Sequence, residues 1–199
     1  MSTNIEPNFE NPTERVLYPM QYELDKEEQM RLRGGLTLWL ISMSIPMVLL
    51  YELRYVISGK YVAPNANWLL GLLGLVAMVI AGLLTSAAVR SAKRHNQRAI
   101  LIQTGWAFWF ALAAMVLVGW QVCDRTINPI SHFGEMFFVC QGTGAFYILT
   151  TIIAVLALRG RVKRLAGSIK NYWGASATNA FVWYVCVFWA LLYLLIYWL

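Results

Sequence analysis

Five long apolar stretches occupy almost all of the chain after residue 34. Each is about 20 to 25 residues long, which is the length of a helix that crosses the roughly 30 Å hydrocarbon core of a bilayer. Because lipid offers no partners for backbone polar groups, such stretches are best interpreted as helices. The pattern therefore predicts an all-α fold, a polytopic membrane bundle of five transmembrane helices. Their expected bounds are about 36–57, 68–89, 99–122, 134–158 and 178–198.

Charged side chains are almost absent from these stretches. The interiors of the last four contain no Asp, Glu, Lys or Arg, and the first contains only Glu52 and Arg54, near its outer end. We expect these two side chains to pair with each other or to snorkel toward the membrane surface. Gln103 and Gln141 are expected to form hydrogen bonds between helices.

The basic residues predict the orientation of the bundle. Most of them gather in the two loops that join the second helix to the third and the fourth helix to the fifth. Basic loops beside membrane helices mark the cytoplasmic side, so both loops and the N-terminus are expected inside and the C-terminus outside. The loop residues are Arg90, Lys93, Arg94 and Arg98, and then Arg159, Arg161, Lys163, Arg164 and Lys170.

The first 34 residues differ from the rest of the chain. Residues 1–34 hold seven of the ten acidic residues and are expected to form an acidic cytoplasmic segment, followed by a transmembrane domain over residues 35–199. The segment has neither the basic start nor the short apolar core of a secretory signal, so we expect it to be retained. It is either a solvated leader that ends in a short polar helix or a segment that docks onto a neighbouring subunit. The candidate docking side chains are Tyr18, Pro19, Met20 and Tyr22.

Composition agrees with a membrane protein and argues against a nucleic-acid partner. Hydrophobic residues make up 59% of the chain and charged residues 13%, with a mean hydropathy of +0.54. Charged residues make up about a quarter of a typical soluble domain. The net charge of +6 lies in membrane-flanking loops rather than on a basic soluble face of the kind that binds nucleic acid.

The sequence carries no pattern typical of a catalytic or metal centre. His95 and His132 fall in loops on opposite sides of the predicted membrane, so they cannot converge on one haem or copper ion. Cys123, Cys140 and Cys186 lack metal-ligand spacing such as C-x-x-C. We therefore expect no cofactor bound by this chain alone.

Small residues indicate where helices approach one another closely. Gly82 and Ser86 give the end of the second helix a small-residue surface, and Gly142 and Gly144 do the same in the fourth. Pro46 is expected to kink the first helix and to free a carbonyl, which a neighbour or Ser42 then satisfies.

Six segments in order along residues 31–198 resemble subunit III of the haem–copper respiratory oxidases, in its short five-helix bacterial form. The first segment, GLTLWLIS at 35–42, resembles the opening G-x-W-L-F-x-A-S-E of that family. The last, 181–198, follows its closing helix, with aromatic residues at unchanged spacing. The other segments are Ala92, Arg94 and Asn96 in the first basic loop, GWQ at 119–121 with Asp124, FFV at 137–139 with Gly142, and RGR at 159–161.

The chain departs from this family at its buried ionisable positions. Uncharged residues stand where the family has a membrane glutamate after the first serine, two histidines on the fourth helix, and a histidine and an aspartate on the last. A role in proton uptake through those side chains is therefore not carried over to this chain. The replacing residues are Met43, Gly144, Tyr147, Trp183 and Cys186.

The resemblance implies a non-catalytic subunit of a respiratory terminal oxidase in the bacterial plasma (inner) membrane. Such a subunit stabilises the catalytic subunit I, reaches subunit II through it, and binds lipid. Haem and copper are then expected in the partner subunits, and structural phospholipid on this chain. The electron donor, cytochrome c or quinol, binds other subunits. The expected contact surface for subunit I is the face of the first two helices that carries Ser42, Pro46, Gly82 and Ser86.

Two other functions stay open. The same resemblance is shared with the subunit III-like protein associated with nitric oxide reductases. A stand-alone membrane scaffold or small transporter is the alternative from a different class. Copurification with haem separates the first two functions from the third, and the gas that is reduced separates oxidase from nitric oxide reductase.

Overall fold

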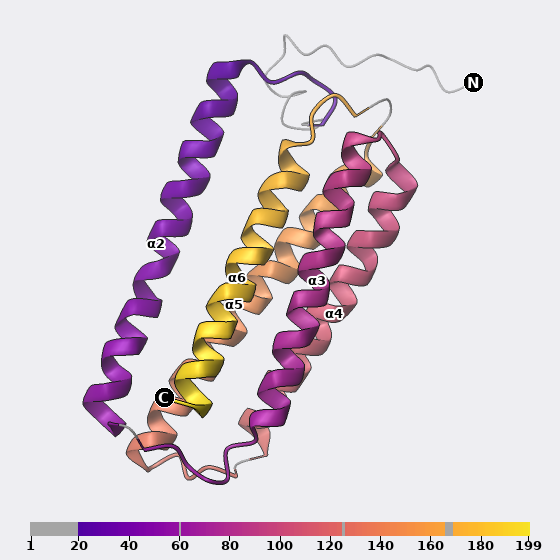
Figure 1. Cartoon of the computed structure of the whole chain (residues 1–199). Coiled ribbons are helices and arrows are strands. Elements are labelled where there is room, and N and C mark those ends of the chain that lie inside the picture. Colours follow the sequence, from indigo (N-terminus) through magenta and orange to yellow (C-terminus); the bar gives the residue numbers. More distant parts are fainter. Residues whose placement is uncertain (1–19, 60, 125, 166–168) are drawn as a thin grey trace.

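The computed structural model describes residues 20–59, 61–124, 126–165 and 169–199, and over these residues it is all-α. Five helices are long and apolar enough to cross a membrane, which identifies a multi-pass membrane protein and confirms the five predicted spans. The helices run antiparallel to their neighbours in sequence (Figure 1). They are α2 (Lys26–Ser58), α3 (Trp68–Lys93), α4 (Gln97–Cys123), α5 (His132–Lys163) and α6 (Trp173–Tyr197).

All five helices extend beyond the predicted apolar stretches, and α2, α5 and α6 extend furthest, because polar residues can continue a helix outside the hydrocarbon. The helix α2 starts at Lys26 instead of residue 36, since the polar helix expected before it is continuous with the span. Its 33 residues correspond to about 50 Å, well over the bilayer core. At the same end of the molecule, α5 continues to Lys163 and α6 already begins at Trp173.

Side-chain caps fix several helix starts. Asn67 accepts a hydrogen bond from the backbone N–H of Leu70 at 3.3 Å, and Asn96 accepts one from Ala99 at 3.1 Å. Ser131 caps α5 in the same way through the N–H of Gly134 at 3.0 Å. Each cap satisfies one of the backbone donors that a helix leaves open in its first turn.

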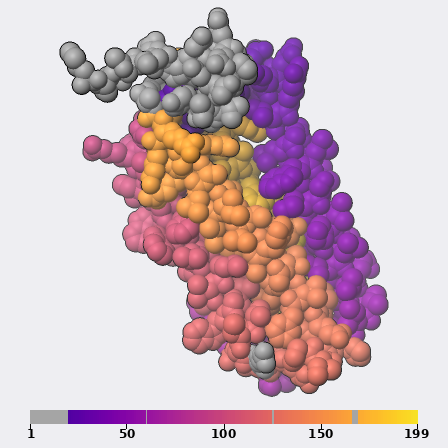
Figure 2. All heavy atoms as spheres, turned by 180° about the vertical axis from the view of Figure 1, so that it is seen from behind, coloured from indigo at the N-terminus to yellow at the C-terminus, as the bar shows by residue number. Residues whose placement is uncertain are grey.

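The five helices divide into a four-helix unit and one lateral helix. α3 packs against α4 and α6, and α5 packs against α4 and α6, so these four helices close into a ring of contacts. Within the described ranges α2 contacts α5 and α6 but neither α3 nor α4. From behind, α2 runs along one edge of the molecule, next to α5 (Figure 2). The fifth helix is therefore attached along one side only.

A tryptophan fills the centre of the four-helix unit. Trp189 of α6 is 2% exposed and its ring lies between two glycines, Gly74 of α3 and Gly144 of α5. A Cβ at Gly144 would overlap the six-membered ring, and one at Gly74 would lie 3.6 Å from Nε1. Because lipid gives no hydrophobic drive for helix association, this close packing of a large ring against small residues stabilises the unit.

Candidate functional site

Among the residues described, no group of three or more His, Cys, Asp or Glu side chains could hold a metal ion. The structure places His95 in the turn between α3 and α4 and His132 at the start of α5, at opposite ends of the molecule (Figure 1). Cys140 and Cys186 are buried, and Cys123 is exposed at the end of α4. The candidate functional features are therefore surfaces and the contacts that shape them.

The contact line between α2 and the four-helix unit, here called the α2 seam, consists of a few specific interactions. The Trp39 ring lies 4.8 Å from that of Phe181, centroid to centroid. The Tyr147 hydroxyl donates to the carbonyl oxygen of Met43. The hydroxyls of Ser44 and Tyr184 are 3.1 Å apart and share a hydrogen bond. Aromatic residues of α5 and α6 thus hold the middle of α2.

Hydrogen bonds from neighbouring hydroxyls surround the position of Pro46. α2 continues through this proline, whose missing N–H leaves a gap in the backbone ladder. In the turn before it, Tyr147 donates to the carbonyl of Met43, and the Ser44 hydroxyl donates to that of Leu40 at 2.9 Å. A neighbouring helix therefore contributes to this turn through Tyr147. Neither bond goes to the carbonyl of Ser42, which lies four positions before Pro46 and is the one that the proline leaves free, so how that carbonyl is satisfied stays a prediction.

Arg54 closes the α2 seam at the end of the molecule opposite the basic loops. Its side chain is 1% exposed, and its Nε donates to the carbonyl of Leu195 in the last turn of α6 at 3.2 Å. Its Nη1 donates to the carbonyl of Gly59 at 2.6 Å, and its Nη2 to that of Tyr61 at 2.8 Å. The expectation that Arg54 pairs with Glu52 is wrong, because the guanidinium instead binds carbonyls at the end of α6 and just beyond the end of α2.

The opposite face of α2 is uncovered. Ser42 and Pro46 are exposed, and so is Glu52, which turns away from Arg54. The other exposed side chains along this face are mostly large and apolar, as suits contact with lipid or with another membrane helix. They include Leu38, Ile41, Ile45, Val48, Leu49 and Val56.

Gly82 and Ser86 lie on a different surface and contact α6 of the same chain. The Trp183 Nε1 donates to the Ser86 hydroxyl at 2.9 Å, and this hydroxyl lies 2.9 Å from Asn179 Oδ1. A Cβ at Gly82 would lie 3.2 Å from the Trp183 ring. The four residues expected to meet a partner are thus split between α2 and α3, which do not touch within the described ranges. That they contact another subunit stays a prediction.

The N-terminal segment turns back onto the bundle at Met20. This side chain is 2% exposed and packs in a small apolar cluster with residues of α3, α4, α5 and α6. Its carbonyl accepts hydrogen bonds from the N–H groups of Lys170 at 2.9 Å and Asn171 at 3.1 Å. Tyr22 is partly buried, and Tyr18 and Pro19 lie outside the described residues. Docking of this segment onto a neighbouring subunit stays a prediction, but Met20 is covered by its own chain.

Internal contacts occupy the positions where the resemblance would place ionisable groups. Gly144 makes room for Trp189, and the backbone of Met43 accepts from Tyr147. Two side chains of α6 donate to α3. Trp183 donates to the Ser86 hydroxyl, and the thiol of Cys186 donates to the carbonyl of Met78 at 3.1 Å. These side chains join helices instead of offering titratable groups.

A polar cluster toward the end of the molecule opposite the basic loops joins α4, α5 and α6. Gln141 Nε2 donates to Gln121 Oε1 at 2.6 Å, and the Tyr197 hydroxyl donates to the same oxygen at 2.6 Å. Gln103 accepts from Ser91 at 2.9 Å, so both glutamines expected to bond between helices do so. Gln121 and Tyr197 entered the sequence analysis only as positions of the family resemblance, and their hydrogen bond was not predicted. Gly71 was an available signal of a close approach, since a Cβ there would lie 2.6 Å from the Tyr197 ring.

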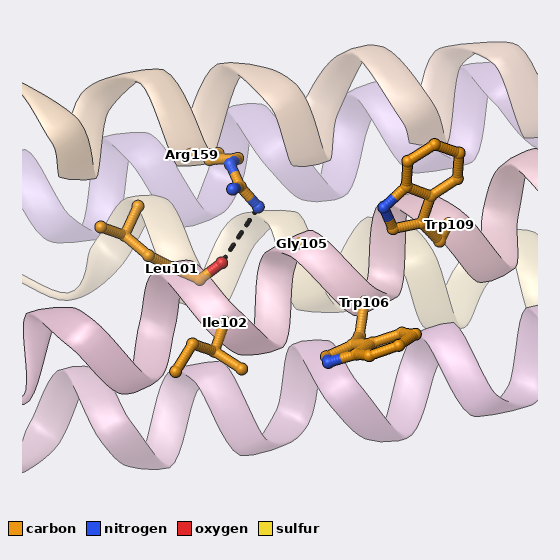
Figure 3. A pocket seen from close by; sticks show the side chains of 6 residues that line it. All are labelled: Leu101, Ile102, Gly105, Trp106, Trp109 and Arg159. Carbon is orange, nitrogen blue, oxygen red and sulfur yellow. Dashed lines mark hydrogen bonds between the residues drawn. The ribbon is translucent and has the colours of Figure 1, made fainter.

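An open groove of about 550 Å³ runs along the outside of α4 where it meets α5 (Figure 3). Arg159 of α5 reaches over Gly105 and donates from Nη1 to the carbonyl of Leu101 at 3.0 Å. Trp106 and Trp109 line the other end and are 57% and 60% exposed. The groove is thus apolar with one cation at its end.

No protein-family model matches this chain, and no curated protein matches its sequence. The family resemblance of the six segments therefore rests on those residues themselves.

Proposed function

We propose that this chain is a non-catalytic subunit of a respiratory haem–copper terminal oxidase, related to subunit III, that stabilises the catalytic subunit I. The observation that carries the proposal is the ordered resemblance of six segments over residues 31–198. The chain itself would bind neither haem nor copper, which belong to the partner subunits. Its work would be that of a scaffold in the membrane.

The uncovered face of α2 supports this role. A lateral helix held along one side leaves most of its surface open to a second membrane protein. Glu52 is exposed on α2, within two turns of the helix end at Ser58. A carboxylate at this depth is costly in lipid, and a polar partner would remove that cost. We therefore assign the contact with subunit I to the exposed face of α2 rather than to Gly82 and Ser86.

We further propose that the N-terminus is inside and the C-terminus outside, in a bacterial plasma membrane. The described Lys and Arg residues other than Arg54 lie at or near the end of the molecule where α2 begins (Figure 1). The two basic loops thus lie on one side of the bundle, as the positive-inside rule requires of cytoplasmic loops.

The test is purification in mild detergent through a tag at the N-terminus, followed by a haem spectrum and mass spectrometry. Haem a- or o-type absorbance together with a large multi-helix partner is the expected result. If the purified complex reduces nitric oxide instead of oxygen, the chain is an accessory subunit of a nitric oxide reductase. A colourless, solitary five-helix protein would overturn the proposal in favour of a scaffold or transporter.

A pair of matched variants locates the contact surface in the same experiment. Ile45 on α2 and Ile153 on α5 are 58% and 57% exposed. We expect Ile45→Trp to lower the haem recovered per chain, because the larger ring would obstruct packing against subunit I. Ile153→Trp adds the same ring on α5 and is expected to leave recovery unchanged.

A further inference from the structure

The groove between α4 and α5 holds a cation that the described residues do not neutralise. Arg159 is partly buried, and its hydrogen-bond acceptor is a neutral carbonyl, that of Leu101. No described carboxylate lies within ion-pair distance of its guanidinium. Of the five N–H donors of an arginine, most therefore remain available to another ligand.

The direction of Arg159 makes this cation unusual. Side chains of a helix lean toward its N-terminus, and for α5 that end is the opposite one from the basic loops. Arg159 accordingly reaches toward Gly105, which lies two turns into α4, instead of toward the near membrane surface. A Cβ at Gly105 would overlap its Nη1, so the glycine is what gives the guanidinium this place.

The rest of the groove fits the apolar part of a lipid. Ile102, Trp106 and Trp109 continue along α4 away from the charged end for about 12 Å. Each indole nitrogen lies on the side of its ring that faces the Arg159 end (Figure 3). Tryptophan has this arrangement at membrane interfaces, where its ring contacts chains and its N–H meets polar groups.

We propose that this groove is a binding site for an anionic phospholipid, whose phosphate meets Arg159 and whose acyl chains lie along Trp106 and Trp109. The surrounding basic loops attract anionic lipid to this end of the molecule, and the groove then retains one molecule. The resemblance to subunit III already implies phospholipid on this chain; the groove adds its place and the preference for an anionic headgroup. That addition needs only a chain that resides in a membrane.

The test uses the full chain in nanodiscs of equal parts phosphatidylcholine and phosphatidylglycerol. After extraction into detergent, native mass spectrometry counts the lipids that each chain retains. We expect one phosphatidylglycerol on the wild type, and about fivefold less on Arg159→Gln, as one basic residue near a membrane contributes about that factor. Gly105→Ala keeps every charge but displaces the guanidinium, and it is expected to lower retention as well.

Arg94→Gln is the matched control, since it removes the same charge from an exposed position at the same end of the molecule. An equal loss on Arg94→Gln would overturn the site and leave only a diffuse attraction to the basic loops. Equal retention of phosphatidylcholine would overturn the preference for an anionic lipid. Unchanged lipid in both groove variants, with loss of a protein partner instead, would assign Arg159 to a carboxylate of that partner. The lipid count does not depend on whether haem copurifies with the chain. A failure of the oxidase proposal and a failure of the lipid site can therefore be told apart.

Discussion

At the scale of single residues, small side chains decide where the large aromatic ones can lie. Gly144 faces Trp189, whereas Gly142, two positions earlier, has open space where its Cβ would be. The sequence predicted both as close-approach positions, and for Gly142 this is wrong. Successive helix positions are about 100° apart, so two glycines separated by one residue point to different sides. A glycine in a sequence indicates that another helix can come close, but it does not tell which face of its own helix has that neighbour.

We expect Gly144→Ala to destabilise the protein by about 1–3 kcal/mol, because the added methyl group overpacks the Trp189 slot. The measurement is thermal or denaturant unfolding in detergent micelles. Gly142→Ala is the control on the same helix, and we expect it to change stability by no more than about 1 kcal/mol, in the stabilising direction, because alanine favours helix. Equal effects of the two variants would contradict the packing described for Trp189.

At the scale of helices, the sequence could predict the number and rough bounds of the elements but not their neighbours. Length and apolarity suffice to find a membrane span, so five stretches gave five helices. In lipid, however, the face of a helix that meets protein need not be more apolar than the face that meets lipid, so hydropathy does not tell them apart. Only sparse polar or small residues mark a contact. Tyr147, which ties α5 to α2, lies in an otherwise apolar run and gave no such signal.

The α2 seam depends on few interactions, so a single hydroxyl should matter. Tyr147→Phe keeps the ring but removes the bond to the Met43 carbonyl, and we expect attachment of α2 to weaken by about 1 kcal/mol. The measurement is the labelling rate of a cysteine at Met47, a buried α2 position, by a membrane-permeant maleimide in a chain without its natural cysteines. The rate should rise about fivefold.

Tyr55→Phe provides the comparison for this variant. Tyr55 lies on α2, the helix that carries the labelled position, and its side chain is 44% exposed. The loss of its hydroxyl should therefore leave the labelling rate of Met47→Cys unchanged. If both tyrosine variants accelerated labelling alike, the effect would arise from a general loosening of the helix and not from the seam.

At the scale of the whole molecule, charge is distributed unevenly between the two ends. One end carries the basic loops and the start of α2, whereas the described basic residue at the other end, Arg54, is buried. The sequence alone could predict this asymmetry, since it needs only the order of spans and loops. The buried position of Arg54 depends partly on the carbonyl of Leu195, which is 141 residues away in the chain, and local sequence does not encode that contact.

The charge asymmetry makes a prediction that the natural cysteines can test. Cys123 is exposed at the end of α4 that we expect outside, whereas Cys140 and Cys186 are buried. A membrane-impermeant maleimide added to spheroplasts should therefore label the wild-type chain, and Cys123→Ser should abolish the signal. In inside-out vesicles the same reagent should fail until detergent is added, because the thiol then faces the lumen. Labelling of the vesicles and not of the spheroplasts would reverse the orientation and place the basic loops outside, against the electrostatic preference that the proposed topology follows.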